Sequence, residues 1–292
     1  MSDGALGPAA EVEARPLDPS ERPAARTHLG RRTRENLVLI DLVERVGAPG
    51  APGEMPAAVV AAWRGGGLLS VAALRPSLVL EPQVEPEVLD ALFPFLDAVA
   101  VGLLKSALPA ADAAWRRLAG RRRRRTLVDR IETAYALAPA GARLVEARRG
   151  DVVRRAGRGD LDALVYAARE SLREEHRPDP FAGDPRGFRR WVRGRVSRAW
   201  VVESSGRVVF AGYADVQRPA GWLLQGVYTW PEARRRGFAS VGVSALCAQA
   251  FAAGAEHVQL AVVEGNEAGH RLYRGLGFEP FAALRTVLFA QA

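Results

Sequence analysis

The chain has 292 residues, of which 48% are hydrophobic and 25% are charged, and its only cysteine is Cys247. This length suffices for one large domain or two of ordinary size, and the composition is typical of a globular protein with a sizeable core. A single cysteine excludes a disulfide within the chain, and no apolar run of about eighteen residues predicts a membrane span. The first twenty residues lack the pattern of a secretory signal, so we expect a cytoplasmic protein.

The formal net charge is +8, and Lys105 is the only lysine among 41 basic residues. A nucleic-acid-binding protein usually concentrates positive charge on one element, and only Arg121 to Arg125 does so here. We favour a solvated loop between a helix and a strand for this run, which makes nucleic-acid binding unlikely as a function. The arginines between 186 and 198 are similarly open to two interpretations, a solvated helix face or the lining of a site for an acidic substrate.

The first half of the chain alternates helical and strand patterns after residues 1–30, which we expect to form a disordered tail. Apolar residues recur at helical spacing from Leu37 to Val46, and Gly47 follows as a stop. The expected elements after this helix are a hairpin over 58–74 with a glycine turn at 65–67, a helix over 86–98, a strand over 99–104, a helix over 110–118 and a strand over 125–137.

The second half begins a similar series near Val145. The expected elements are a strand at 152–154, a helix over 160–175, a helix over 185–196 and a hairpin over 200–210 with a turn at 204–206. The two hairpins lie roughly 140 residues apart, as a tandem duplication would place them. From the hairpins alone, duplication and chance similarity remain equal alternatives.

The most informative segment follows a β-prone run at 222–229. It reads Arg234-Arg235-Arg236-Gly237-Phe238-Ala239-Ser240, continues as a helix to about Ala253, and leads to another strand at 257–263. The first amides of a helix lack internal partners, and the helix dipole adds partial positive charge there. Because Gly237 and Ala239 keep the loop free of bulk, the sequence predicts a site for a phosphate-bearing ligand.

The pattern R-x-x-G-x-A at Arg234, Gly237 and Ala239 resembles the acyl-CoA-binding signature of the GNAT acyltransferase superfamily. The stretch from Asn266 to Phe278 resembles the second part of that signature, N-x-x-A-x-x-L-Y-x-x-x-G-F, with Gly269 in place of the usual alanine. The segment RENLVLIDLVER around Asn36 further resembles a GNAT subfamily with a divergent N-terminal domain. The resemblance implies an α/β fold, a mixed sheet flanked by helices, in two tandem GNAT-like domains at residues 31–147 and 148–292.

In this superfamily the cofactor arm enters between two parallel strands, which would here be 222–229 and 257–263. The resemblance therefore implies that acetyl-CoA is the cosubstrate and that no metal is needed. It assigns acetyl-CoA binding to Val227, Tyr228, Thr229, Arg234, Arg235, Arg236, Gly237, Phe238, Ala239, Ser240 and Asn266. After the expected strand at 99–104 the chain reads Lys105-Ser106-Ala107-Leu108-Pro109, without glycine. We therefore predict that the first half binds no acyl-CoA of its own.

The resemblance implies an N-acetyltransferase that transfers the acetyl group to an amine of a small molecule or protein. Tyr273 stands at the family's position for the proton donor, although a packed aromatic is the alternative. The base is left open, with Glu174 and Glu175 preferred over Asp215 and Glu264. Cys247 and the four histidines show no metal-ligand spacing, and Cys247 is expected in the core. The alternative function is a non-catalytic acyl-CoA sensor whose N-terminal domain recruits a partner. Neither the acceptor nor the oligomeric state follows from the sequence.

Overall fold

The computed structural model of the chain describes residues 10–50, 54–121 and 124–292. Within them, two series of elements follow one another in the same order. The first series is β1 (Glu13–Pro16), α1 (Arg22–Leu29), α2 (Thr33–Glu44), β2 (Ala58–Arg64), β3 (Gly67–Arg75), β4 (Val79–Leu80), α3 (Pro86–Asp97), β5 (Gly102–Ala107), α4 (Leu108–Arg121) and β6 (Arg124–Leu137). The second series is β7 (Asp151–Arg155), α5 (Leu161–Glu174), α6 (Pro185–Arg195), β8 (Ala199–Ser204), β9 (Arg207–Arg218), β10 (Gly221–Thr229), α7 (Phe238–Ala252), β11 (Val258–Val263), α8 (Glu267–Gly275) and β12 (Glu279–Gln291).

This repetition confirms the predicted mixed α/β fold with two tandem halves. Strands β1 to β4 form one sheet, in which each strand pairs with the next, and β7 to β10 repeat the same order within a second sheet. The helix from Thr33 and both predicted hairpins are present. Gly47 has a φ of +79°, which suits its role as the stop after α2.

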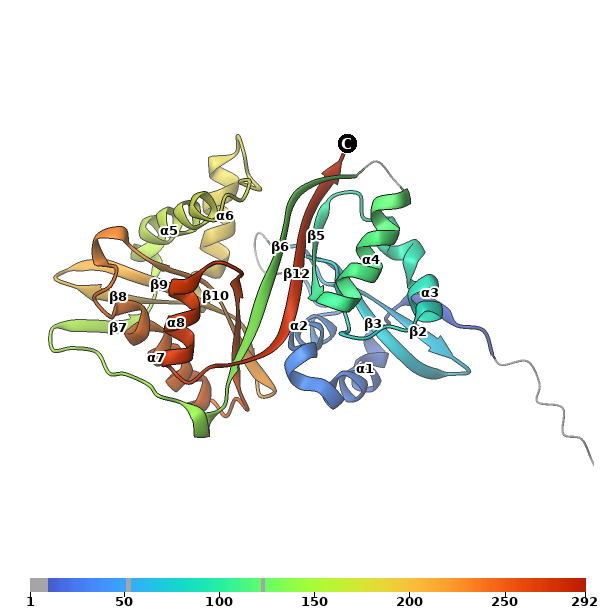
Figure 1. The fold of residues 1–292 in the computed structure, drawn as a ribbon, viewed down its shortest axis with the longest axis horizontal. Coiled ribbons are helices and arrows are strands. Elements are labelled where there is room, and N and C mark those ends of the chain that lie inside the picture. The colour runs from blue at the N-terminus through green and yellow to red at the C-terminus, as the bar shows by residue number, and fades with distance from the viewer. Residues whose placement is uncertain (1–9, 51–53, 122–123) are drawn as a thin grey trace, which may run out of the picture.

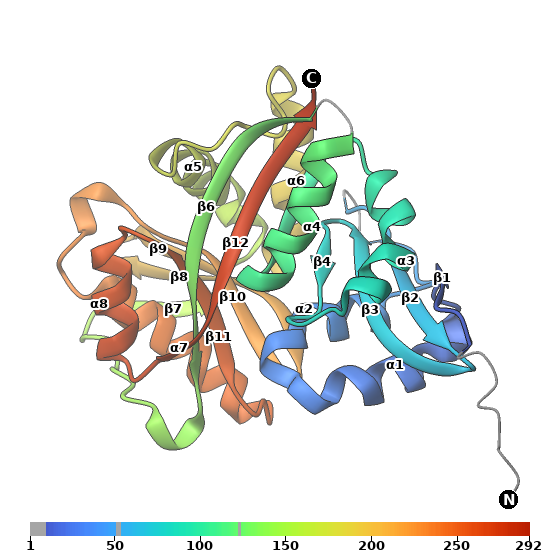
Figure 2. The same ribbon diagram turned by 45° about the vertical axis from the view of Figure 1, so that its right-hand side comes forward.

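The last strand of each half pairs with the other half. The second sheet has the order β5-β12-β6-β11-β10-β9-β8-β7, so β6 lies between β11 and β12 while β12 lies between β5 and β6. Both views show β6 and β12 running side by side between the two halves (Figures 1 and 2). The exchange joins both halves through one continuous hydrogen-bonded sheet. Figure 2 places α7 and α8 on one side of these strands and α1 and α3 on the other.

Each half packs two helices on either face of its strands. In the second half, α7 and α8 bury Phe238, Leu246 and Tyr273 against one face, and α5 and α6 bury Leu164 and Phe188 against the other. The first half repeats this arrangement, with α1 and α2 on one core and α3 and α4 on another. The helix pairs therefore leave the edges between strands, and the loops that follow them, as the places where ligands can approach.

The expectation of a disordered tail over 1–30 is wrong for the described part of that segment, residues 10–30. Strand β1 pairs with β2, and α1 buries Ala25 and Leu29 completely. Leu17 is also buried, and its amide donates to the carbonyl of Val59 at 2.9 Å. The apolar residues are too sparse to give a helical period, so only packing against the sheet reveals their role. Residues 1–9 lie outside the described part.

Two further expectations are corrected by the packing. The segment Lys105 to Pro109 is not a loop, because it finishes β5 and begins α4. The loop that matches the Arg/Gly loop of the second half is instead the one between β4 and α3. In the arginine run, residues 122–123 lie outside the description, but Arg124 is buried and donates to Asp97 at 3.0 Å rather than facing solvent.

The arginines of α6 are only partly a solvated face. Arg195 pairs with Asp215 and lies 4.3 Å above the Tyr213 ring, while Arg198 pairs with Glu54 of the first half. Arg198, which directly follows α6, therefore ties this face of the sheet to the first half, whereas Arg195 makes its contacts within the second half. Every helix of the described residues is too short or too polar to span a lipid bilayer.

Candidate active site

The parallel strands β10 and β11 separate soon after they begin. They pair only at Trp222 with Val258 and at Leu223 with Gln259. Beyond these residues, β10 stays paired with β9 and β11 stays paired with β6. Within the described chain, the edge of β10 that faces β11 therefore has no strand partner after Leu223. Such an edge can accept an extended ligand through backbone hydrogen bonds.

A bulge in β10 lies where the strands part. Between the pairs Gln225–Tyr213 and Tyr228–Ala211, β10 has two residues where β9 has one. Gly226 adopts a φ of +57°, and a Cβ there would lie 2.9 Å from a ring carbon of Tyr213. A bulge bends its strand and redirects the following residues. The sequence analysis missed this feature, although an isolated glycine inside a β-prone run is its usual signal.

The loop between β10 and α7 ends at Gly237, which directly precedes α7 and has a φ of +88°. No side chain caps this helix, and the Val241 amide donates to the Gly237 carbonyl at 3.1 Å. The amides of residues 238–240 consequently precede the first intrahelical bond and have no acceptor within the helix. Arg235 and Arg236 are exposed beside them. Together these groups form a site suited to an anion.

Arg234, the first residue of the motif, points to a different partner. Its guanidinium donates to both carboxylate oxygens of Glu174, at 2.6 and 2.9 Å, and to the Thr229 carbonyl at 3.0 Å. The Tyr228 hydroxyl donates to Glu174 at 3.5 Å. Burial and the neighbouring Glu174 carboxylate raise the pKa of Tyr228 to about 12. The motif arginine therefore ties the loop to the end of α5, and Glu174 is not a free carboxylate.

The remaining candidate bases differ in their surroundings. Glu175 accepts from Arg130 of β6 at 2.9 Å, and Asp215 is held by Arg195. Glu264 is exposed just after β11. The structure thus gathers Glu174 and Glu175 at one end of α5, next to residues of β10 and β6, but engages both in ion pairs.

Tyr273 and Asn266 lie on α8 and at its start. The Tyr273 side chain is 7% exposed and packs edge-to-face on Phe278 at 5.6 Å. Burial raises the pKa of Tyr273, so its hydroxyl stays protonated near neutral pH. Asn266 caps α8 by accepting from the Gly269 amide at 2.9 Å. A Cβ at Gly269 would lie 3.0 Å from Val262, which explains a glycine at this position of the motif.

Two buried polar groups on β6 were missed by the sequence analysis. The Tyr135 hydroxyl lies 2.8 Å from Nδ1 of His270 on α8. Glu132, which is 2% exposed, pairs with Lys105 and Arg130 and accepts from the Thr286 hydroxyl at 2.7 Å. Burial by itself raises the pKa of Glu132, but the opposite effect of these partners is larger, and the resulting pKa is about 2. A carboxylate inside a strand was the available signal, but two of its three partners, Lys105 and Thr286, come from β5 and β12.

Cys247 is fully buried, as expected, and burial raises its pKa to about 12. Among the described residues, no group of three or more histidine, cysteine, aspartate or glutamate side chains is arranged to hold a metal ion.

Comparison with known proteins shows that the part of the chain with this geometry matches a family profile. Residues 164–278 match the profile described as "Acetyltransferase (GNAT) family". This stretch contains the parted strands, the Arg/Gly loop and the second motif up to Phe278. The chain carries a GNAT acetyltransferase domain. A search of the curated proteins finds no match.

Solved structures extend the similarity of the GNAT domain to nearly the whole chain. A Drosophila protein has a TM-score of 0.72 at 14% identity and covers 94% of this chain and 98% of its own. A GCN5-related N-acetyltransferase from Sphaerobacter thermophilus has a TM-score of 0.57 at 17% identity, with 94% of each chain covered. A tandem GNAT protein from the clavulanic acid biosynthesis pathway has a TM-score of 0.55 at 14% identity, covering 96% and 98%. At such identities these structures show the fold, including its tandem form.

Proposed function

We propose that this chain is an acetyl-CoA-dependent N-acetyltransferase whose active site lies in the second half. The observation that carries the proposal is the uncapped start of α7 beside the parted strands β10 and β11. The family profile and the shared fold support acyl transfer in general. Acetyl-CoA, the amine acceptor and the roles of individual residues are the proposed refinements.

The residues present fit acetyl-CoA. Backbone groups of Val227 and Thr229, at the unpaired edge of β10, would bind the amides of the pantetheine arm. Amides from Arg235 to Ser240 would hold the pyrophosphate, with the guanidinium groups of Arg235 and Arg236 adding charge. Asn266 caps α8 with its oxygen, which leaves its amide nitrogen for the cofactor arm.

In the proposed reaction, the neutral amine attacks the thioester carbonyl, a new C–N bond forms and the C–S bond breaks. The amine nitrogen loses a proton, and the departing thiolate gains one. Tyr273 would supply that proton, since its raised pKa keeps the hydroxyl protonated. Glu174 is the preferred acceptor of the amine proton, because it contacts Tyr228 and Arg234 next to the cofactor loop. Glu175 is the second candidate.

The test is release of free thiol from acetyl-CoA in the presence of a panel of amines and peptides. We expect acceptor-dependent release, and a fall in turnover of about 100-fold in Tyr273→Phe with acetyl-CoA affinity unchanged. The Glu174→Gln variant should also lose turnover while it keeps acetyl-CoA affinity. If the Tyr273→Phe variant keeps the turnover of the wild type, Tyr273 has only a packing role.

A second candidate function is a non-catalytic acyl-CoA sensor. The observations that favour it are the absence of any carboxylate from β10 and the ion pairs that engage Glu174 and Glu175. A sensor would bind acetyl-CoA in a titration and release no thiol with any acceptor. Acceptor-dependent release removes this alternative.

A further inference from the structure

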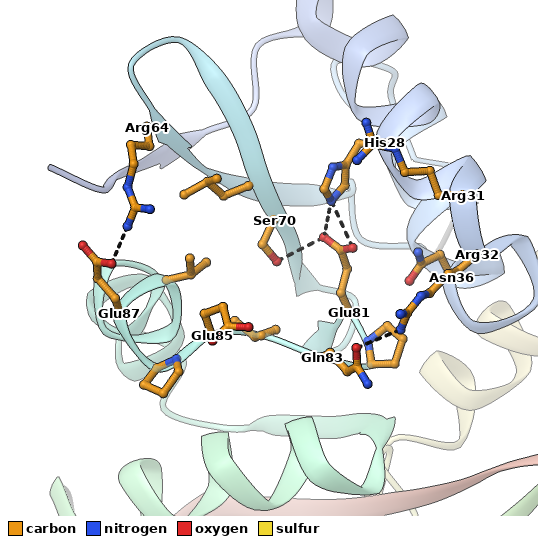
Figure 3. A pocket seen from close by; sticks show the side chains of 15 residues that line it. His28, Arg31, Arg32, Asn36, Arg64, Ser70, Glu81, Gln83, Glu85 and Glu87 are labelled. Carbon is orange, nitrogen blue, oxygen red and sulfur yellow. Dashed lines mark hydrogen bonds and ion pairs between the residues drawn. The ribbon is translucent and has the colours of Figure 1, made fainter. Parts of the chain in front are cut away.

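The first half contains a pocket of about 740 Å³ at the place that corresponds to the candidate active site of the second half. It lies between the turn joining α1 to α2, strand β3 and the loop from β4 to α3 (Figure 3). This loop is the counterpart of the Arg/Gly loop, since each joins the fourth strand of its half, β4 or β10, to the next helix. Both ribbon views show α1 and α3 across β6 and β12 from α7 and α8.

The floor of this pocket presents buried acceptor oxygens. Glu81 is held by His28 and Ser70, each at 3.1 Å, and by the Val71 amide at 2.8 Å. Three of these contacts reach Oε1, whereas Oε2 receives only the His28 contact at 3.1 Å. A carboxylate has about four acceptor sites, so Oε2 can accept from a further donor.

Asn36 supplies a second, independent observation. Its side chain lines the pocket, is 2% exposed, and donates from Nδ2 to the Leu29 carbonyl at 3.1 Å. Its Oδ1 is buried and has no hydrogen-bond partner among the described residues. A buried acceptor without a partner is costly, and a donor from a bound molecule would satisfy it.

The rim of the pocket carries mixed charge. Arg64 pairs with Glu87, and Arg32 donates to Gln83 at 3.1 Å (Figure 3). Arg31 and Glu85 are exposed at the same rim. Acceptors on the floor suit a group rich in N–H donors, and the arginines of the rim suit an anionic group.

We propose that this pocket binds a small zwitterion of the amino-acid class, with its ammonium group on the floor and its carboxylate at the rim. The ammonium donates to Asn36 Oδ1 and Glu81 Oε2, and the carboxylate pairs with Arg31. The site belongs to the first half and binds its ligand without acetyl-CoA. The duplicated fold would then hold a phosphate-bearing ligand in one half and an amine-bearing ligand in the other.

The experiment is saturation-transfer NMR on the full chain with γ-aminobutyrate, propylamine and butyrate as probes of matched length, without acetyl-CoA. We expect saturable binding of the first two and none of butyrate. The zwitterion should bind roughly two- to five-fold more tightly than propylamine, as an exposed ion pair adds little. Glu81→Gln should weaken both amines by at least about ten-fold, since it removes a charged acceptor.

Arg31→Gln gives a second readout that does not disturb the floor. It should abolish the preference for γ-aminobutyrate over propylamine and leave propylamine binding unchanged. The control is Arg26→Gln, an exposed arginine of the preceding helix α1 that pairs with Glu44 and does not line the pocket. The proposal is overturned if neither amine binds wild type saturably, or if a folded Glu81→Gln variant binds both as wild type does.

Discussion

In the second half, the loop from β10 to α7 carries Arg234, Arg235, Arg236 and Gly237. In the first half, the corresponding loop from β4 to α3 reads Glu81-Pro82-Gln83-Val84-Glu85, and Pro86 then occupies the first turn of α3. The β10–α7 loop offers free amides and positive charge, whereas the β4–α3 loop offers carboxylates and lacks one amide at Pro86. One topology therefore presents two loops of opposite charge, and the ligands that we propose for them differ accordingly.

Giving the β10–α7 loop the acidic character of the β4–α3 loop should have the largest effect. Gly237→Glu places a side chain at a φ of +88° and a negative charge where a pyrophosphate would bind. We expect acetyl-CoA affinity to fall by at least about 100-fold in calorimetric titration. The wild-type chain should bind one acetyl-CoA, and Glu85→Gly should not add a second. Two molecules bound per wild-type chain would contradict the difference between the halves.

The shared sheet predicts that the halves depend on each other. Glu132→Gln on β6, at the junction with β12, removes the charged partner of Lys105 and one of the two carboxylates that pair with Arg130, and should lower the free energy of unfolding by on the order of 3 kcal/mol. Urea unfolding followed by tryptophan fluorescence measures this change. Glu279→Gln, at the exposed end of β12, should change it by less than about 0.5 kcal/mol. Equal effects of the two substitutions would argue against a special role for the junction.

The same carboxylate predicts an acid-dependent difference. The pKa of Glu132 is about 2 in the folded chain, compared with 4.5 for an ordinary glutamate, so the folded state binds this proton less readily. Its contribution to stability is fully present above pH 4.5 and is lost as the pH falls toward 2. The stability gap between wild type and Glu132→Gln should therefore narrow over this range. A gap independent of pH would mean that the carboxylate charge is not what stabilises the junction.

The smallest expected effect concerns the bulge that β10 has and the two-residue strand β4 does not show. Gly226→Ala should cost about 1–2 kcal/mol of stability, because its backbone is left-handed and its Cβ would meet Tyr213. Acetyl-CoA affinity should fall with it, since the bulge redirects Val227. Gly206→Ala, at a hairpin turn with φ of +74° and open space around it, controls for backbone strain alone. If both variants lose acetyl-CoA affinity equally, the bulge has no specific role in acetyl-CoA binding.

Much of the candidate site could be predicted from the sequence, because it is built from consecutive residues. The motif at Arg234 to Ser240 specifies a loop and a helix start, and those are local structures. The sequence does not show which group each motif side chain contacts. Arg234 turns to Glu174, and the pairing depends on where α5 ends relative to β10. Sequence spacing does not carry that distance.

The first half shows the reverse case. The sequence pattern places the corresponding loop at Lys105 to Pro109, because the weak apolar pattern at Val79–Leu80 gives no sign of β4. A strand of two residues is recognised by its neighbours, here β3 and the bridge from Leu78 to Leu104. The pocket around Glu81 and Asn36 therefore stayed invisible until the chain was folded.

By itself, the sequence determined most of the helices and strands and the loop that begins α7, since helical and strand periods and glycine positions act within a few residues of one another. Only the tertiary structure decided that β6 pairs with β11 and that β12 returns between β5 and β6. An alternating apolar pattern marks a strand but does not name its neighbour, because strand pairing joins backbone groups that are far apart in the chain. The ion pairs of Glu132 and the covered segment at residues 10–30 follow from that pairing and packing.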